Sequence, residues 1–261
     1  MQNTMPYLEN FPVPFIEIEE TDSTNRYLSE YCRNHKVDEF TTVSTTKQTA
    51  GKGQMGNRWE SEPGKNLTCS FVVYPTFIEA KNQFIISQIV SLSIKEELEQ
   101  WIEHISIKWP NDIYWKEKKI CGILIENDLT GSSISKCIVG FGLNINQQEF
   151  RSDAPNPVSL YQITGKEHDQ LLILSGIMQR LKAYYMRLQH ETINIESSEK
   201  DYITKKYEKS LFRKEGFHRY TDQGGEFLAH LVRVEPDGRL ILEDTSGRTR
   251  LYLFKEVHYI L

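Results

Sequence analysis

Two lysines and an aspartate lie close together in the middle of the chain, in a pattern suited to chemistry on anions. Lys108 and Asp112 begin and end the segment KWPND, and Lys119 follows a short distance later. A lysine ammonium can offset negative charge on a phosphate or carboxylate, and an aspartate carboxylate can act as a general base. An isolated lysine is more often a solvated surface charge, so these residues become candidates only through their neighbouring motifs.

A glycine-rich segment at residues 49–59 supplies a second candidate site. Its glycines satisfy the pattern G-x-G-x-x-G: Gly51, Gly53 and Gly56. A dinucleotide-binding fold needs a helix directly after this pattern, whereas residues 58–66 contain Pro and Gly and lack helical periodicity. A Rossmann site is therefore not expected. Three cations lie in or beside the segment: Lys52, Arg58 and Lys65. Accessible backbone N–H groups and cations together favour an anion-binding loop over a plain surface loop.

Hydroxyl and amide side chains at two further places could bind a planar polar group. Ser23, Thr24 and Asn25 stand at the expected start of a helix, and Gln48 stands at the end of an expected strand. Together their side chains supply both hydrogen-bond donors and acceptors. N-capping of the helix is the ordinary explanation for the first three residues, and Gln48 alone indicates nothing.

The hydrophobic pattern indicates the elements that must hold these residues. Helices are expected from Asp22 or Ser23, as a long amphipathic helix over about residues 82–103, and as a pair after residue 165. Strands are expected at 41–46, 67–74, 105–109, 113–115, 120–126 and 134–145, with a hairpin turn at 116–119. Alternate residues from Leu67 to Val73 are apolar and share one side of their strand. Residues 146–165 contain prolines and are expected to form a loop.

The character of the chain changes near Leu211. Tight-turn signals at 224–225, 236–238 and 246–247 separate four or five short expected strands, which is typical of a small β barrel of about 50 residues. Helices mixed with hairpins and followed by a β module predict an α+β protein. The expected domains are residues 1–210 and 211–261.

Composition and charge narrow the class of protein. The 261 residues include 31 Lys+Arg against 36 Asp+Glu, a formal charge of −5, which argues against broad nucleic-acid binding. The four cysteines show no metal-ligand or disulfide spacing, which is typical of a reduced compartment. No signal peptide and no apolar run long enough to cross a bilayer are visible, so a cytoplasmic protein with no membrane partner is expected.

Five segments taken together resemble the biotin protein ligases, which adenylate biotin and pass it to a lysine of a carboxylase carrier domain. The segments are residues 21–25, 47–59, 108–112, 119–126 and 140–146. The joint occurrence of KWPND with the glycine-rich loop is far more specific than either motif alone. The resemblance covers about residues 21–261. It implies a mixed-sheet catalytic domain of the class II synthetase-like type, followed by a small SH3-like β barrel.

The resemblance also implies roles for individual residues. The implied biotin-binding residues are Ser23, Thr24, Asn25, Gln48, Gly51, Lys52, Gly53, Gln54, Lys119 and Gly122. The implied adenylate or ATP contacts are Lys52, Gln54, Gly56, Arg58, Trp59, Asn66, Lys108, Asn111, Gly142 and Asn144. The implied catalytic residues are Lys52, Lys108, Asp112 and Lys119. No metal site made by protein side chains alone is expected.

Within these roles, some assignments stay open. Lys119 is expected near the biotin carboxylate and the phosphoryl group, where it offsets developing charge. Lys108 is expected either to contact the nucleotide phosphates or to pair with Asp112, and Asp112 is a candidate base for the carrier lysine. Family members often carry Arg where this chain has Lys52 and Gln54, so fewer bidentate contacts to the adenylate are expected here.

The implied activity is ATP-dependent formation of biotinyl-5′-AMP and transfer of biotin to a carrier lysine, with Mg²⁺ bound mainly through the ATP phosphates. The alternative is a ligase for lipoate or another short acid, and a non-catalytic vitamin-binding protein is a weaker one. About 20 residues precede Thr21, too few for a helix-turn-helix, so no DNA partner is expected. The expected partner is a biotin carboxyl carrier domain, and the chain is expected to be a monomer or homodimer.

Overall fold

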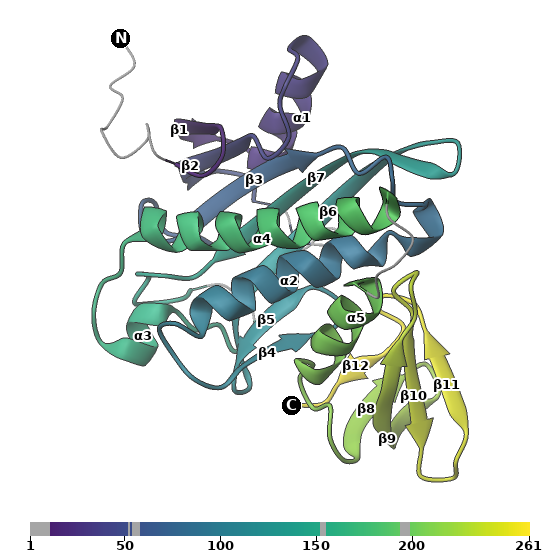
Figure 1. Ribbon diagram of the computed structural model, residues 1–261. Helices are drawn as coiled ribbons and strands as arrows, with labels where there is room; N and C mark the ends of the chain where they lie inside the picture. The colour runs from purple at the N-terminus through teal and green to yellow at the C-terminus, as the bar shows by residue number, and fades with distance from the viewer. Residues whose placement is uncertain (1–10, 52, 54–57, 152–154, 194–198) are drawn as a thin grey trace.

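A seven-stranded mixed sheet forms the centre of the larger part of the molecule. The computed structural model describes residues 11–51, 53, 58–151, 155–193 and 199–261. The strands are β1 (Phe15–Thr21), β2 (Thr42–Gln48), β3 (Leu67–Val73), β4 (Ile105–Lys108), β5 (Asp112–Trp115), β6 (Lys118–Thr130) and β7 (Ser133–Leu143). Their order in the sheet is β1-β2-β3-β7-β6-β5-β4 (Figure 1). β1 runs parallel to β2, and the other neighbouring strands are antiparallel.

Helices cover both faces of this sheet. They are α1 (Thr24–Asn34), α2 (Phe84–Leu98), α3 (Leu160–Thr164), α4 (Gln170–Ile193) and α5 (Glu199–Lys209), with a short 3-10 turn at Ala80–Asn82. Figure 1 shows α2 and α4 lying across one face, while α1 stands at the far end beside β3 and β7. The expected alternation in β3 is confirmed. Its odd-numbered residues enter the main core with α2 and α4, whereas Val72 joins Leu28 of α1 in a second, smaller core.

The long amphipathic helix expected over residues 82–103 differs in length and in character. The helix α2 begins at Phe84 and ends at Leu98, and nearly all of its residues are buried. Its serines, including Ser91 and Ser93, are buried with the aliphatic residues because α4 and α5 cover the side that faces away from the sheet. A helix buried all round loses the apolar stripe that a half-exposed helix shows.

Two elements were not anticipated from the sequence. The edge strand β1 carries the alternating segment FIEIEET, which is a half-buried strand pattern. The short helix α3 lies in the expected loop, and it has a complete capping box between Ser159 and Gln162, followed by Gly165 in the left-handed conformation. Both capping signals are readable in sequence, but a helix of five residues is too short to show periodicity.

The C-terminal residues form a separate antiparallel sheet. Its strands are β8 (His218–Asp222), β9 (Gly225–Val234), β10 (Leu240–Asp244), β11 (Thr249–Tyr252) and β12 (His258–Tyr259), in the order β11-β10-β9-β8-β12. Gly225, Gly238 and Gly247 have positive φ at the three expected turns. The expected α+β class with a C-terminal β module is therefore confirmed.

The two sheets meet at the KWPND segment. The Ile107 N–H donates to the Ser210 carbonyl at 2.8 Å and the Phe212 N–H to the Ile107 carbonyl at 2.8 Å, so the linking residues pair with β4. Trp109 is buried, and its indole N–H donates to the Gly238 carbonyl at 2.9 Å. The C-terminal sheet is thereby fixed against a motif singled out for chemistry.

Candidate active site

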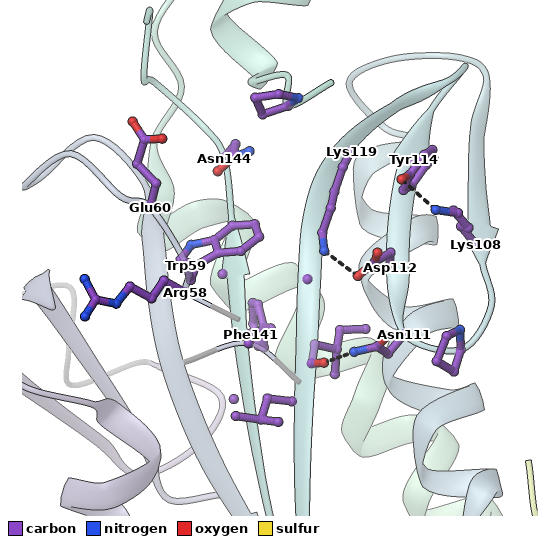
Figure 2. Close-up of a pocket in the computed structure, with 18 of the residues that line it drawn as sticks. Arg58, Trp59, Glu60, Lys108, Asn111, Asp112, Tyr114, Lys119, Phe141 and Asn144 are labelled. Carbon is purple, nitrogen blue, oxygen red and sulfur yellow. Dashed lines mark hydrogen bonds and ion pairs between the residues drawn. The ribbon is translucent and has the colours of Figure 1, made fainter. Parts of the chain in front are cut away.

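A cavity of about 940 Å³ collects most of the residues singled out from the sequence. Its walls come from the start of α1, the end of β2, the middle of β3, β5, β6 and β7, and the last residues of the chain. Figure 2 shows Trp59 on one side of it, with Lys119, Asp112 and Lys108 facing from the opposite strands. The predicted residues that line it are Ser23, Thr24, Asn25, Gln48, Gly53, Arg58, Trp59, Lys108, Asn111, Asp112, Lys119, Gly122, Gly142 and Asn144.

The polar end of the cavity is formed where α1 begins. Ser23 occupies the N-cap position, yet its side chain makes no capping hydrogen bond. The Thr24 N–H instead donates to Gln48 Oε1 at 2.9 Å, so an amide from β2 satisfies the first turn of the helix. N-capping therefore does not explain the Ser23 hydroxyl, which lines the cavity. Gln48 was predicted for the site, but its hydrogen bond to Thr24 was not, because only the fold brings the end of β2 beside the start of α1.

The charged end is organised by one ion pair. Lys119 Nζ lies 2.7 Å from Asp112 Oδ1, and both side chains are largely buried (Figure 2). Asp112 begins β5 and Lys119 lies near the start of β6, so the hairpin between these strands brings the two groups together. The ammonium also lies 5.6 Å from the centre of the Trp59 ring. A cation, an anion and an aromatic face therefore meet at one point of the cavity.

Lys108 has different partners from those expected. Its Nζ donates to the Tyr114 hydroxyl at 3.0 Å and lies 4.8 Å and 5.3 Å from the ring centres of Tyr114 and Tyr259. Pairing with Asp112 was one of two expectations, and it is wrong because Asp112 pairs with Lys119. Burial lowers the pKa of Lys108, and the charge of Asp112 partly opposes that effect. Its second expected role, contact with phosphates, stays a prediction.

Trp59 lies directly against the backbone of two strands. A Cβ atom placed on Gly142 would lie 2.3 Å from the Trp59 indole nitrogen, and one on Gly122 would lie 3.0 Å from its ring. Gly122 and Gly142 are paired across β6 and β7, so the Trp59 ring packs on a surface of backbone atoms without side chains. This close approach explains why glycine stands at both positions.

Two buried polar atoms near this ring have no hydrogen-bond partner among the described residues. They are the indole nitrogen of Trp59 and Oδ1 of Asn144. The Asn144 amide nitrogen donates to the Val158 carbonyl at 3.1 Å, which orients the side chain and leaves its oxygen available. Both residues line the cavity, one with a donor and the other with an acceptor. Buried polar atoms are normally satisfied, so this pair indicates a ligand that carries both functions.

Some predicted residues lie behind the cavity wall, some line the cavity but direct their polar groups elsewhere, and three lie outside the described residues. Asn66 is buried, accepting from the Ile145 N–H at 2.9 Å and donating to the Gln147 side chain, so its amide supports the backbone. Gly51 packs against Gln48 and the Trp59 backbone. Arg58 is exposed and extends away from the ion pair (Figure 2). Asn111 lines the cavity, but its amide donates to the Ile123 carbonyl. The predicted residues outside the described part of the chain are Lys52, Gln54 and Gly56.

The cavity also contains residues that sequence reasoning missed. Tyr114 and the C-terminal residues Lys255, His258 and Tyr259 contribute to its wall. No local motif marks these C-terminal residues, because only the junction between the two sheets brings them to the site. Tyr114 stood inside an expected strand, and the period of that strand alone does not say which face meets a ligand.

Neither a metal site nor a membrane span is formed by the described part of the chain. Within those residues, no group of three or more His, Cys, Asp or Glu is placed to hold a metal ion. No helix formed by the same residues is both long enough and apolar enough to span a bilayer.

Comparison with known proteins agrees with this geometry. Over 95% of its length the chain superposes on 99% of a biotin protein ligase from Aquifex aeolicus in complex with biotin and ATP, with TM-score 0.75 and 29% identity. It is 28% identical over 232 residues to the bifunctional ligase/repressor BirA of Bacillus spizizenii, matching 84% of this chain and 66% of that protein. It is 23% identical to a biotin--[acetyl-CoA-carboxylase] ligase of Mycobacterium tuberculosis, covering 89% and 84% of the two chains.

The match to a protein family covers the part of the chain that builds most of the cavity. Residues 17–144 match the family described as Biotin/lipoate A/B protein ligase, a range that begins in β1 and ends just after β7. The resemblance inferred from the sequence motifs is thus confirmed by the family match, the relatives and the fold. Residues 17–144 of the chain form a domain of the biotin/lipoate A/B protein ligase family.

Proposed function

We propose that the chain activates biotin with ATP to form biotinyl-5′-AMP and transfers the biotinyl group to a lysine of a biotin carboxyl carrier domain. The observation that carries the proposal is one cavity with two chemically different ends. Hydroxyl and amide groups of Ser23, Thr24 and Gln48 form one end, and Lys108 and Lys119 form the other. Biotin has a urea at one end and a carboxylate at the other, and the carboxylate is where ATP must react.

The polar end offers groups suited to a urea. Gln48 Oε1 already accepts from the Thr24 N–H, so the Gln48 amide nitrogen is oriented as a donor for a carbonyl oxygen. The hydroxyls of Ser23 and Thr24 can accept from ring N–H groups. A simple alkyl chain would leave these buried polar groups without partners, which costs binding free energy. This end therefore favours biotin over lipoate.

The cationic end is suited to adenylation. A biotin carboxylate oxygen attacks the α-phosphorus of ATP, a new P–O bond forms, the bond to the bridging oxygen breaks and pyrophosphate leaves. Negative charge grows on the phosphoryl oxygens in this step, and the Lys119 ammonium stabilises it. Mg²⁺ enters with the nucleotide, held mainly by phosphate oxygens. We assign the unpartnered Trp59 N–H and Asn144 oxygen to the adenylate.

The second step transfers the acyl group. The carrier lysine attacks the biotinyl carbonyl carbon, a C–N bond forms, the bond to the phosphate oxygen breaks and AMP leaves. The amine must lose a proton, and Asp112 is the carboxylate closest to Lys119 in the cavity wall. Once Lys119 binds the phosphate, Asp112 is released from its ion pair and can accept that proton.

Pyrophosphate exchange tests the proposal. Labelled pyrophosphate should enter ATP when biotin is present and not when lipoate replaces it. Exchange with lipoate alone would instead identify a lipoate ligase, which the same family description includes. No exchange with either acid would reject a ligase function. Mass spectrometry of a carrier domain incubated with biotin and ATP would then detect the transferred group.

The proposed reaction implies a partner protein, a cellular location and a domain organisation. The carrier domain is expected to add a strand to an edge of the ligase sheet, as in β-augmentation, and β1 is one such edge. We propose a cytoplasmic enzyme, monomeric or homodimeric, without DNA or a membrane as partner. We also propose that residues 1–210 and 211–261 are its two domains.

A further inference from the structure

Ser70, a residue outside the cavity wall, sits behind the polar end of the site. It lies in β3 and is fully buried. Its hydroxyl oxygen lies 2.7 Å from the Thr24 hydroxyl and 2.6 Å from Asn25 Oδ1. A serine hydroxyl has a single proton, so it can donate to only one of these two groups. The direction of each bond therefore depends on the other groups in the chain of contacts.

The hydrogen bond between Asn25 and Glu126 determines which group donates in the two contacts of Ser70. The Asn25 amide nitrogen donates to Glu126 Oε2 at 2.7 Å, and an ionised carboxylate can only accept. The amide oxygen of Asn25 must then face Ser70, and an amide oxygen can only accept as well. The Ser70 proton is thus committed to Asn25. The remaining contact between Ser70 and Thr24 must be donated by Thr24.

The backbone of β7 holds the amide in this place. A Cβ atom on Gly140 would lie 2.0 Å from Asn25 Oδ1 and 3.1 Å from the Ser70 hydroxyl. Asn25 therefore lies flat on the strand at Gly140. The amide is confined between Ser70, Gly140 and Glu126. If it turned over, its nitrogen could still donate to the Ser70 oxygen, but its oxygen would face the Glu126 carboxylate without a proton between them, so the contact with Glu126 holds the amide in one orientation.

We infer that Ser70, together with Asn25 and Glu126, fixes the Thr24 hydroxyl as a hydrogen-bond acceptor toward the cavity and thereby selects a ligand with an N–H donor at this point. The inference rests on the proposed function and deepens it, since the urea of biotin supplies such an N–H. Ser70 is a positioning residue, because it acts through Thr24 and does not line the cavity.

The variant Ser70→Ala tests the inference. Without the Ser70 oxygen, the Thr24 proton loses its short contact in the core and can turn toward the cavity, where it opposes the ligand N–H. If Gln48 Oε1, 3.3 Å away, held this proton instead, Thr24 would remain an acceptor and KM for biotin would not change, which would overturn the role of Ser70. In biotin-dependent pyrophosphate exchange, KM for biotin should rise about tenfold, while KM for ATP stays within about twofold of the parent value. A general loss of structure would move both constants.

Ser93→Ala is the matched control. Ser93 is equally buried, and its hydroxyl donates to the Ile89 carbonyl at 2.6 Å inside α2, away from the cavity. It should lower the melting temperature and leave both KM values unchanged. If Ser70→Ala leaves KM for biotin within twofold of the parent, or raises both KM values by one factor, the inference is wrong. If the parent itself shows no biotin-dependent exchange, the proposed function fails first and the inference with it.

Glu126 provides a second test that does not disturb the core. Its side chain is exposed, so Glu126→Ala should fold even if Ser70→Ala does not. Loss of the carboxylate frees the Asn25 amide to turn, and KM for biotin should rise about threefold with KM for ATP unchanged. Glu126→Gln keeps an acceptor oxygen for Asn25 and should recover most of the parent value. An unchanged KM for biotin in Glu126→Ala would overturn the inference.

Discussion

Lys119 and Asp112 hold one another in place across the cavity wall, with their charged atoms 2.7 Å apart. In the proposed reaction, an incoming phosphate competes with Asp112 for the ammonium, so binding of the nucleotide is expected to change the partners of both groups. The same residue pair can thereby serve adenylation through the cation and transfer through the released carboxylate. Charge exchange between two fixed side chains needs no movement of the backbone.

The substitution Asp112→Asn separates the two roles. Pyrophosphate exchange should stay within about threefold of the parent, because Lys119 keeps its charge. Transfer from preformed biotinyl-5′-AMP to a carrier domain should slow about a hundredfold, because the amide cannot accept the proton. Single-turnover measurements of both half-reactions would check this. Equal loss in the two half-reactions would remove the base role from Asp112.

Lys108 should set the pH above which kcat/KM for ATP falls. Burial lowers the pKa of Lys108, so this lysine loses its charge at a lower pH than an exposed lysine does. Below the lowered pKa it is a cation and can contact phosphate; above it the contact is lost. We expect kcat/KM for ATP to fall as the pH rises through that range, and Lys108→Arg to move the fall to higher pH, since a guanidinium keeps its charge.

An exposed lysine of the same hairpin, Lys118, supplies the control for this pH profile. Lys118→Arg should leave the profile unchanged, because Lys118 faces solvent. A profile that does not move in Lys108→Arg would show that another group sets this pH.

At the scale of elements, the strands β6 and β7 shape the site because they carry glycines where the ligand-facing residues pack against them. Gly122 and Gly142 face one another across the two strands, and Trp59 lies on both. Two residues earlier in β7, Gly140 accommodates Asn25 in the same way. A strand with side chains at these positions would hold the ring and the amide away from the sheet. The cavity therefore depends on bare backbone as much as on functional groups.

A graded pair of alanine substitutions tests this arrangement. The new Cβ in Gly142→Ala would lie 2.3 Å from the Trp59 indole nitrogen, whereas that in Gly122→Ala would lie 3.0 Å from the ring. Gly142→Ala should raise KM for ATP about tenfold or more, and Gly122→Ala by a smaller factor, because the ring must shift further in the first case. Equal effects of the two variants, or none, would show that the ring does not bind the nucleotide.

The elements also show how far the sequence could predict the structure. Strong periodicity predicted β3 and its two faces, and the turn glycines predicted the C-terminal strands. The motif residues Lys119 and Asp112 were predicted for the site, but their pairing was not, because it depends on the register of β5 and β6, in which Asp112 lies opposite Gly122 and Lys119 opposite Tyr114. Ser70 could not be found, since a buried serine in an apolar strand resembles any other until α1 is docked on it.

At the scale of the whole molecule, both sheets contribute residues to the wall of the cavity, and the two sheets contact each other through buried residues. Leu211 pairs with Ile107 at the edge of the larger sheet, and Trp109 donates to Gly238 of the smaller one. Tyr259 of the last strand, β12, then lies against Lys108, with its ring centre 5.3 Å from Nζ. The buried residues of both sheets also belong to one continuous hydrophobic core. We therefore expect binding in the cavity to depend on the position of the C-terminal sheet.

This junction predicts cooperative unfolding. Far-ultraviolet circular dichroism and intrinsic fluorescence should report one coincident transition in urea. Trp109→Phe removes the hydrogen bond to the Gly238 carbonyl and should lower the free energy of unfolding by about 1–3 kcal/mol. Trp115→Phe is the matched control, because Trp115 lies in β5 away from Gly238. Two separated transitions in the parent would mean that the proposed domains fold independently.

The backbone surface at Gly140 and Gly142 has a consequence for the design of inhibitors. A compound that presses against Gly140 and Gly142 contacts main chain, which a point mutation can change only by adding atoms. Any added atom at these positions displaces Asn25 or Trp59, so a mutation that blocks the compound also damages the groups that hold the natural ligand. Inhibitors that bind to these glycines should therefore meet few resistance mutations that also preserve activity.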